Sequence, residues 1–290
     1  MDNQITEETK LVKKLLHLDD ASSIVYIDEG WTSRVYIVND GQFVAKFPRR
    51  EEVKKEYVQE IAILKLLDDI KSGVLVPKLF LTDANNDYLI YKGIIGESLG
   101  TLPVLSDQTI EQTIGANLGR FLKQLHGLKL IGAVSRTVED QIAQFQNKYE
   151  TAKNYLSREL TTDENSLLNK WVYSILPERL KAVGYDKALC HGDLGYWNMI
   201  LSSNNQIGVI DFGDIGYWDR SMDFVGMEST VMLDSALKVY GDNAVLRDKI
   251  ALRKKIPPLL DLPYYLDKND KEGIVKTLVK IKLHFLSDNA

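Results

Sequence analysis

Hydrophobic and polar residues follow two different patterns along the chain. In the first third, short apolar runs alternate with polar turns, which is typical of an antiparallel sheet. The predicted strands cover residues 24–27, 34–38, 43–47, 75–79 and 88–91. Two stretches between or before them, residues 5–18 and 51–70, instead carry apolar residues every three or four positions and are predicted to be helices.

Helical periodicity dominates the rest of the chain. It is strongest over 109–128, and further helices are predicted over 138–156, 165–180, 224–240, 244–253 and 273–286. The exception is a pair of apolar runs, 199–201 and 207–210, whose turn-rich linker SSNNQ predicts a β-hairpin. We therefore expect an α+β fold with an N-terminal lobe over 1–92, a glycine-containing connector over 93–100 and a mostly helical C-terminal lobe over 101–290.

Length and composition narrow the class of protein. The 290 residues exceed a typical single domain, and 44% hydrophobic content is enough for two lobes. A net charge of -5 without a basic cluster argues against nucleic acid as a partner. The single cysteine, the polar, acidic N-terminus and the lack of a long apolar run predict a cytoplasmic protein without a membrane partner. No protein partner is implied.

The stretch from Cys190 to Asp223 carries the residue types of phosphoryl transfer. His191-Gly192-Asp193 is followed by Asn198 and then by Asp211-Phe212-Gly213. One carboxylate can orient an attacking hydroxyl, while an amide oxygen and a second carboxylate suit the Mg²⁺ that accompanies a nucleoside triphosphate. The predicted hairpin would place Asn198 and Asp211 at its two open ends, so both candidate ligands would meet at one edge.

A second pair of residues lies in the N-terminal part. Lys46 is in the strand 43–47, on the face opposite Phe43, Ala45 and Phe47, and Glu60 is in the middle of the following helix. A lysine on a strand is commonly a solvated charge. A strand lysine paired with a glutamate on the next helix, however, is the arrangement that fixes the α- and β-phosphates of a nucleotide.

Taken in order, Lys46, Glu60, the glycine connector, Asp193, Asn198 and Asp211 resemble the aminoglycoside phosphotransferase family, relatives of protein kinases that phosphorylate small molecules. The resemblance covers roughly residues 25–230 and is strongest across HGDLGYWN and VIDFGD. It implies a two-lobe, protein-kinase-like fold.

The resemblance also implies roles for single residues. Asp193 would be the catalytic base, and Asn198 and Asp211 would hold Mg²⁺. Lys46 would contact the α- and β-phosphates, with Glu60 holding it in place. Two metal ligands, one lysine and one carboxylate form an almost sufficient set, because phosphoryl transfer depends on positioning and charge neutralisation.

The donor nucleotide stays open between ATP and GTP. By the resemblance, Tyr91 would close the back of the base pocket, and the backbone of Lys92 and Ile94 would bond the base. Some family members with an aromatic residue at this place prefer GTP.

Three further residues of this stretch have structural explanations. His191 is expected to hold its loop by hydrogen bonds, since the family's catalytic role belongs to the aspartate. Asp219 and Asp223 match the acidic pair that follows the family's DFGD, but a helix N-cap and a first-turn charge explain them equally well.

The chain departs from protein kinases at two places. The predicted phosphate loop, 28–33, has one glycine, Gly30, where kinases have three; Thr32 and Ser33 hydroxyls could contact phosphate instead, or the segment is an ordinary polar turn. About ten residues separate Asp211 from the next predicted helix, too few for a peptide-docking activation segment. A small-molecule acceptor is therefore favoured.

The acceptor is the least defined part of the prediction. Residues 221–290 contain ten acids and eleven bases, so no acidic excess marks a site for a polycation. Candidate substrate contacts are Glu228, Asp234, Tyr264 and Tyr265, each with a solvated-surface alternative.

The expected activity is Mg²⁺-dependent transfer of the γ-phosphate of ATP or GTP to a small-molecule hydroxyl, with an aminoglycoside, and hence antibiotic resistance, as the leading candidate. A kinase of choline, a sugar or a macrolide is the first alternative. A nucleotide-binding regulatory protein without turnover ranks low, because no lysine, base or metal ligand is missing.

Overall fold

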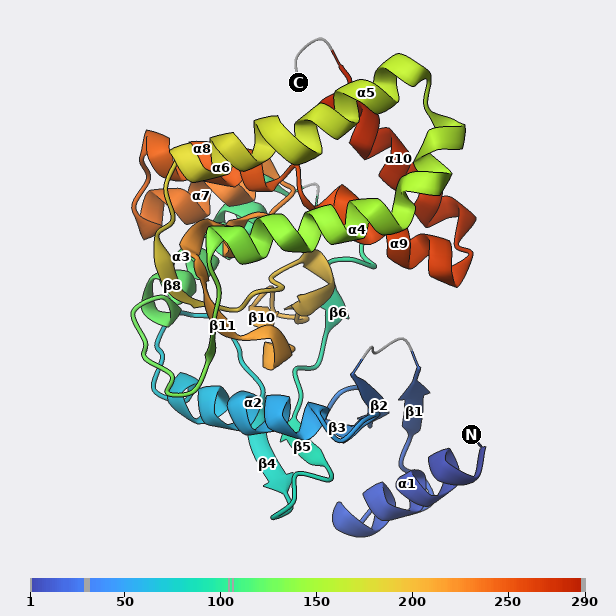
Figure 1. Ribbon diagram of the computed structural model, residues 1–290. Helices are drawn as coiled ribbons and strands as arrows, with labels where there is room; N and C mark the ends of the chain where they lie inside the picture. Colours follow the sequence, from blue (N-terminus) through green and yellow to red (C-terminus); the bar gives the residue numbers. More distant parts are fainter. Residues whose placement is uncertain (1, 29–31, 104, 106, 288–290) are drawn as a thin grey trace. The chain divides into compact units, whose positions relative to one another are not determined.

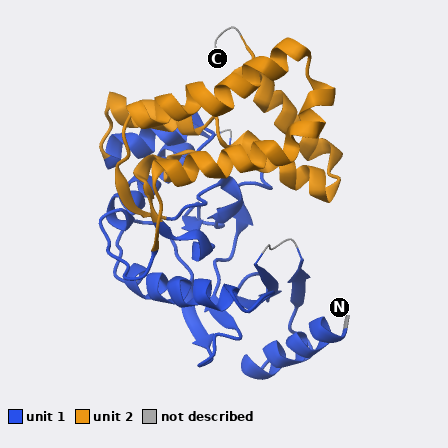
Figure 2. Cartoon of the chain, viewed as in Figure 1, with its two compact units in different colours: residues 1–133, 191–216, 227–240 blue, residues 134–190, 217–226, 241–290 orange. Residues whose placement is uncertain are grey.

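The computed structural model describes residues 2–28, 32–103, 105 and 107–287 (Figure 1). The chain forms two compact units (Figure 2): unit 1 comprises residues 1–133, 191–216 and 227–240, and unit 2 comprises 134–190, 217–226 and 241–290. These units are delimited differently from the lobes predicted from the sequence, and the boundary at 93–100 stays a prediction. All residues predicted for the nucleotide, the metal and catalysis belong to unit 1.

Unit 1 contains a five-stranded antiparallel sheet in the order β1-β2-β3-β5-β4. Its strands are β1 (Ile24–Ile27), β2 (Ser33–Val38), β3 (Phe43–Pro48), β4 (Lys78–Thr82) and β5 (Leu89–Lys92). In the central strand β3, Lys46 pairs with Val35 of β2 on one side and with Leu89 of β5 on the other. The lysine therefore stands on a strand that is fixed from both edges.

The two faces of this sheet are covered by different helices. One face packs Tyr36, Ala45 and Phe47 against α1 (Asp2–Leu15). The other packs against α2 (Val53–Leu67), whose Tyr57 contacts the β5 residues in a second small core. The predicted alternation along β3 is confirmed, since Lys46 and Ala45 point to opposite faces.

One predicted strand was misplaced. The strand expected over 75–79 begins only at Lys78, because Pro77 has no N–H to contribute to a ladder. Leu75 instead pairs with a strand far along the chain: its N–H donates to the Ile207 carbonyl (2.9 Å), and its carbonyl accepts from the Val209 N–H (2.9 Å). This bridge joins the N-terminal part of unit 1 to the predicted hairpin.

The hairpin itself forms as predicted. Strands β9 (Met199–Leu201) and β10 (Ile207–Val209) pair antiparallel, and β6 (Glu97–Ser98) of the connector adds to β9 as a third strand. The connector runs so close to the hairpin that a Cβ at Gly96 would lie 2.4 Å from the Leu201 carbonyl oxygen. Only glycine permits this approach.

Two helices of unit 1 pack with their backbones in near contact. Helix α3 (Gln108–Leu125) places Gly119 against α7 (Thr230–Tyr240), where a Cβ would lie 2.2 Å from the Ala236 carbonyl oxygen.

The helix expected over 224–240 begins later than predicted, at Thr230. Gly226 disfavours continued helix, and the Ser229 hydroxyl accepts from the Met232 N–H (3.2 Å), as an N-cap does.

Unit 2 is mostly helical. Helices α4 (Val138–Glu159), α5 (Thr162–Lys170), α6 (Leu176–Ala182), α8 (Ala244–Arg253), α9 (Pro257–Lys268) and α10 (Lys271–Phe285) accompany the small sheet β7 (Val134–Ser135), β11 (Gly216–Asp219) and β8 (Lys187–Cys190). A π-helical turn, Trp171–Ile175, joins α5 to α6 within the helix predicted over 165–180.

The sequence pattern did not predict α9. Pro257 and Pro258 occupy its first turn, where no backbone N–H is needed, and Pro263 lies inside it. Because proline usually ends a helix, these three residues argued against a helix in the sequence. Across the described part of the chain, no helix is both long and apolar enough to cross a membrane.

Substitution of Gly96 by alanine tests the close approach of connector and hairpin. A methyl group cannot fit 2.4 Å from the Leu201 carbonyl oxygen, so we expect the free energy of unfolding to fall by about 1–3 kcal/mol in urea denaturation. Gly127→Ala is the matched control, because its Cβ would meet its nearest atom at 3.4 Å. Equal stabilities of the two variants would contradict the packing described here.

Candidate active site

A buried lysine between two carboxylates is the centre of the site. The Nζ of Lys46 on β3 lies 3.0 and 2.9 Å from the two carboxylate oxygens of Glu60 on α2 and 3.1 Å from Oδ1 of Asp211. Lys46 and Glu60 are almost fully buried, whereas the side chain of Asp211 is 54% exposed. The predicted Lys46–Glu60 pair is therefore present, and Asp211 joins it.

The electrostatics of this cluster favour a charged lysine. Burial alone lowers the pKa of Lys46, but the carboxylates of Asp211 and Glu60 outweigh it and hold that pKa well above its usual value. Lys46 in turn lowers the pKa of Asp211. Burial raises the pKa of Glu60, against the opposing effect of Lys46. A fixed cation thus stands beside a partly exposed anion.

Asp211 lies at the end of the hairpin in an unusual backbone conformation. Its φ of 62° and ψ of 75° place it in the left-handed region, which non-glycine residues rarely adopt. The following Phe212 is fully buried and packs its ring 4.8 Å from that of His191. Such strain persists where surrounding packing enforces it, and here it occurs at a predicted metal ligand.

His191 holds the loop 191–198, the candidate catalytic loop, by hydrogen bonds, as predicted. Its Nε2 lies 2.9 Å from the Ile210 carbonyl oxygen, which can only accept, so Nε2 carries the proton. Its Nδ1 accepts from the Asp193 N–H at 3.3 Å. The ring therefore joins the residue before Asp211 to the backbone of Asp193.

Asn198 connects the loop to the candidate base. Its Nδ2 donates to the carbonyl oxygen of Asp193 (2.8 Å) and to Oδ2 of the same residue (3.0 Å). The Ile210 N–H donates to the Asn198 carbonyl (3.0 Å), which closes the hairpin end. The geometry expected from the hairpin, with Asn198 and Asp211 at its two open ends, is confirmed.

The pKa of Asp193 is raised to about 6. The surrounding protein, which excludes water from this carboxylate, is the main cause, and the negative charges of Asp214 and Asp211 add to it. His191 and the hydrogen bond from Asn198 act in the opposite direction. A carboxylate with this pKa is a better proton acceptor than an ordinary surface aspartate.

The donor set fits a hard divalent cation. Asn198 uses its Nδ2 on Asp193, so its Oδ1 is the atom that remains to ligate, and Asp211 offers a partly exposed carboxylate. Amide and carboxylate oxygens are the ligands that Mg²⁺ accepts, usually together with phosphate oxygens of a substrate.

The predicted base pocket lies along β5 and the connector. Tyr91 is buried, and burial raises the pKa of its hydroxyl. The Lys92 backbone pairs with that of Phe43 at the end of β5, and Ile94 follows in the connector. The nucleobase contacts assigned to these residues stay predictions.

The two ends of the predicted phosphate loop are held by residues that the sequence did not single out. Glu29, Gly30 and Trp31 lie outside the described residues. Thr32 accepts at its carbonyl from the Arg49 N–H (2.8 Å), and the buried Ser33 hydroxyl lies 2.8 Å from that of Tyr57.

Of the two residues that hold the loop ends, Tyr57 could have been identified from helical spacing. Tyr57 precedes Glu60 by one turn of α2, so both side chains lie on the same helix face. Arg49 carries no comparable pattern.

The acceptor candidates are divided between the units. Glu228 and Asp234 are exposed residues of unit 1, while Tyr264 and Tyr265 lie on α9 in unit 2 with ring centroids 5.2 Å apart. Their roles stay predictions.

A carboxylate that the sequence did not indicate accompanies Glu228. Glu111 in the first turn of α3 is only 8% exposed. Burial raises the pKa of Tyr196 on the catalytic loop, and the negative charges of Glu228 and Glu111 raise it further. Both carboxylates therefore raise the pKa of one tyrosine hydroxyl, which accepts from the Ser229 N–H (2.9 Å).

Asp219 is a structural residue of unit 2. It is fully buried and caps the short 3₁₀ helix Arg220–Phe224 by accepting from the Ser221 N–H (3.0 Å). Lys249 donates to its other carboxylate oxygen (3.2 Å). The N-cap alternative considered for Asp219 is thus confirmed.

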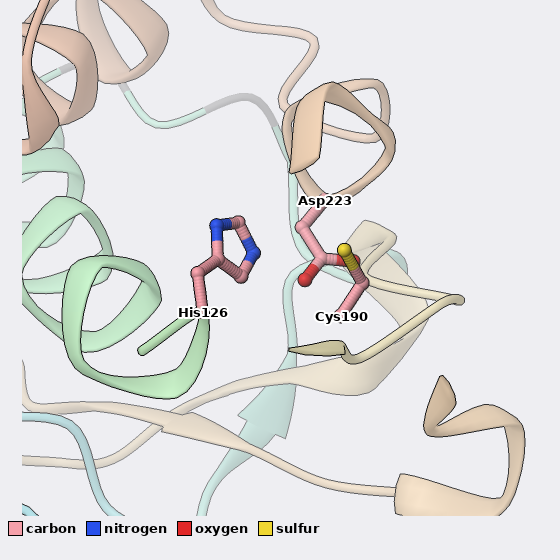
Figure 3. A group of neighbouring side chains, drawn as sticks. All are labelled: His126, Cys190 and Asp223. Carbon is pink, nitrogen blue, oxygen red and sulfur yellow. The ribbon is translucent and has the colours of Figure 1, made fainter. Parts of the chain in front are cut away.

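Asp223 lies beside the only cysteine, Cys190, in unit 2 (Figure 3). The Cys190 Sγ and an Asp223 carboxylate oxygen are within 4.8 Å of each other. Burial and then the charge of Asp223 raise the pKa of the Cys190 thiol well above its usual value. A thiol with a raised pKa is a poor nucleophile.

The chain is similar to a known protein family and to several solved structures. The sequence profile of the phosphotransferase enzyme family (APH) matches residues 23–238. A comparison with curated proteins found no match.

Among solved structures, the GDP and kanamycin complex of APH(2″)-IIIa is 20% identical with a TM-score of 0.77, covering 96% of this chain and 98% of that one. The gentamicin complex of APH(2″)-IIa is 21% identical with a TM-score of 0.69, covering 95% of each chain. The macrolide 2′-phosphotransferase MphH from Brachybacterium faecium is 16% identical with a TM-score of 0.63, covering 94% of this chain and 98% of that one. These similarities establish a kinase-like fold.

Removal of the lysine charge tests the buried ion pair. Lys46→Met leaves the Glu60 carboxylate buried without its cation, so we expect the free energy of unfolding at pH 7 to fall by about 3–5 kcal/mol. The double variant Lys46→Met/Glu60→Leu removes both charges and should recover most of this loss in urea denaturation. A double variant as unstable as the single one would show that the loss comes from packing.

Proposed function

The chain belongs to the phosphotransferase enzyme family, and we propose that it is a Mg²⁺-dependent kinase that transfers the γ-phosphate of ATP or GTP to a hydroxyl group of a small molecule. One observation carries the proposal. Within unit 1, Lys46 is bound to both Glu60 and Asp211, and the hairpin that ends in Asp211 also holds Asn198 against Asp193. A phosphate-binding cation, two oxygen ligands and a base thus belong to one packed unit.

Each residue of this set has a distinct part in the proposed reaction. Lys46, held by Glu60, binds the α- and β-phosphates of the donor. Asn198 fixes the carboxylate of Asp193, which orients the acceptor hydroxyl and receives its proton. As the acceptor oxygen bonds to the γ-phosphorus, the bond to the β,γ-bridging oxygen breaks and the nucleoside diphosphate leaves. Mg²⁺, held by Asn198 and Asp211, would neutralise the negative charge of the phosphates.

We propose an aminoglycoside as the acceptor. Glu111 is a nearly buried carboxylate that, together with Glu228, raises the pKa of the Tyr196 hydroxyl. The N-terminus of α3 stabilises the negative charge of Glu111, because this residue lies in the first turn of that helix. This explains in part why the carboxylate can be nearly buried. It does not account for a second carboxylate that raises the pKa of the same tyrosine. Protonated amines of an aminoglycoside would match this pair, and two of the similar structures contain kanamycin or gentamicin.

Choline, a sugar or a macrolide is the alternative acceptor, and a macrolide phosphotransferase is among the similar structures. A screen of aminoglycosides, macrolides, choline and sugars with both ATP and GTP distinguishes them. A cytoplasmic location, consistent with the single reduced cysteine, is part of the proposal.

Asp193→Asn tests the catalytic step. The amide keeps the shape of the side chain but cannot take a proton, so phosphoryl transfer should fall by about 10²–10⁴-fold while nucleotide binding persists. Phosphate release and product formation are measured for the wild type and the variant. Asp242→Asn, which breaks an exposed ion pair with Arg247 in unit 2, should keep full activity.

The same assay decides between an enzyme and a nucleotide-binding regulator. If the wild type and Asp193→Asn release phosphate equally slowly and no acceptor raises either rate, the enzyme proposal is wrong.

Glu111→Gln tests the nature of the acceptor. The loss of one charged contact should raise the KM for kanamycin by about 10–100-fold and leave the KM for the nucleotide unchanged. Glu159→Gln, at the exposed end of α4, is the matched control. An unchanged KM for every amine-bearing acceptor would remove the argument for a cationic substrate.

A further inference from the structure

Trp197 of the candidate catalytic loop is 67% exposed, although tryptophan is usually among the more buried residues. It lies in the short 3₁₀ helix Tyr196–Asn198, directly before the residue whose side chain holds the candidate base. Asp193 and Trp197 are the two most exposed residues of this loop. The base and the indole therefore reach solvent from the same short segment of unit 1.

The loop that carries Trp197 is folded back on itself. The Gly195 N–H donates to the Asp193 carbonyl oxygen (3.0 Å), and the Asn198 N–H donates to the Gly195 carbonyl oxygen (3.0 Å). The Nδ2 of Asn198 also donates to the Asp193 carboxylate (3.0 Å). These hydrogen bonds hold the backbone of Trp197 close to that of the candidate base.

One face of the indole lies against the connector. A Cβ at Gly100 would lie 2.6 Å from Cδ2, 2.8 Å from Cε3 and 3.0 Å from Cε2 of Trp197. Cδ2 belongs to both rings of the indole, so an atom can come this near to it only over the face of the ring. Gly100 therefore covers one face, and the large exposed fraction of the side chain requires the opposite face to be open.

The backbone below the indole is fixed by the same connector. The Ser98 hydroxyl at the end of β6 lies 3.1 Å from the Tyr196 carbonyl oxygen and 3.2 Å from that of Trp197. The Gly100 N–H donates to the Tyr196 carbonyl oxygen (3.1 Å). An aromatic side chain that is already ordered loses little conformational freedom when a ligand binds to it.

The charges near this segment favour a cationic ligand. Burial and then the negative charges of Glu228 and Glu111 raise the pKa of Tyr196, the residue directly before Trp197. The face of an indole also attracts cations, because its π-system is negatively polarised. A saturated ring with ammonium substituents combines an apolar face for the indole with positive charge for the carboxylates.

We propose that Trp197 binds the acceptor: the open face of its indole stacks on an ammonium-bearing ring of the aminoglycoside and orients that ring's hydroxyl toward Asp193. This inference deepens the proposed function and rests on it. Trp197 is thereby a substrate-binding residue that determines specificity, and the donor nucleotide does not contact the indole.

Replacement of the indole tests the proposal. We expect the KM for kanamycin to rise about 5–30-fold in Trp197→Ala, which loses the aromatic face, and about two- to fourfold in Trp197→Phe, which keeps a smaller one. The KM for the nucleotide should not change, and turnover at saturating kanamycin should be largely retained. A rise in the nucleotide KM alone would mean that the indole stacks on the nucleobase and would overturn the proposal.

Gly100→Ala tests the position of the indole without removing it. Gly100 does not have a positive φ, so alanine suits its backbone, but the added methyl group would displace the ring. The KM for kanamycin should rise severalfold, and the double variant Trp197→Ala/Gly100→Ala should have the same KM as Trp197→Ala. A further rise in the double variant would show that Gly100 acts independently of the indole and would contradict the proposal.

Phe80→Ala is the matched control. It removes another exposed aromatic ring of unit 1, on β4, which is 46% exposed. Its KM values for kanamycin and the nucleotide should equal those of the wild type. Melting temperatures identify any variant that fails to fold, and the exposure of Trp197 predicts that its variants fold normally.

The outcomes separate this inference from the proposed function. If Asp193→Asn suppresses phosphorylation of kanamycin while Trp197→Ala and Gly100→Ala keep the wild-type KM for it, the role of Trp197 is wrong and the kinase proposal stands. If the wild type phosphorylates other hydroxyl compounds but no aminoglycoside, the proposed acceptor is wrong and this inference fails with it.

Discussion

An ammonium group buried in protein needs compensating negative charge, and in this chain that requirement joins three segments. Lys46 comes from the central strand, Glu60 from the helix that covers it, and Asp211 from a hairpin much later in the sequence. The strand is fixed at both edges, and the hairpin is tied to the N-terminal part by the Leu75 bridge. Removing the lysine would leave Glu60 buried without a cation, so the charge cluster and the packing of unit 1 depend on each other.

The sequence predicted those parts of the site that local patterns encode. Alternation along 43–47 gave the orientation of Lys46, and the turn-rich linker gave the hairpin that brings Asn198 and Asp211 to one edge. It failed where a contact depends on residues far apart in the sequence, and where a residue type is compatible with two different structures. Leu75 was predicted to begin the strand 75–79, and the prolines of α9 were compatible with a break between helices. Arg49 is one of many arginines until the structure shows what it binds.

The residues proposed to bind the acceptor could not be predicted from the sequence for the same reason. Counting charges over residues 221–290 shows no acidic excess, which weakened the case for a polycationic substrate. The nearly buried carboxylate Glu111 lies outside that range, on α3, and folding brings its charge to the same tyrosine as Glu228. A count over one segment of sequence cannot detect a pair assembled from α3 and the segment before α7. The candidate base and metal ligands thus lie in one stretch of sequence, whereas the carboxylates proposed to bind the acceptor lie far apart in the chain.

The most direct test of the central claim is the ³¹P NMR spectrum of a Mg²⁺-bound, non-hydrolysable nucleoside triphosphate on the protein. If Lys46 contacts the α- and β-phosphates, their resonances should move when wild-type protein is replaced by Lys46→Met/Glu60→Leu at a nucleotide concentration that saturates both. The γ-phosphate resonance should move less. Coincident α and β resonances in the two proteins would contradict the assignment of this buried lysine to the donor phosphates.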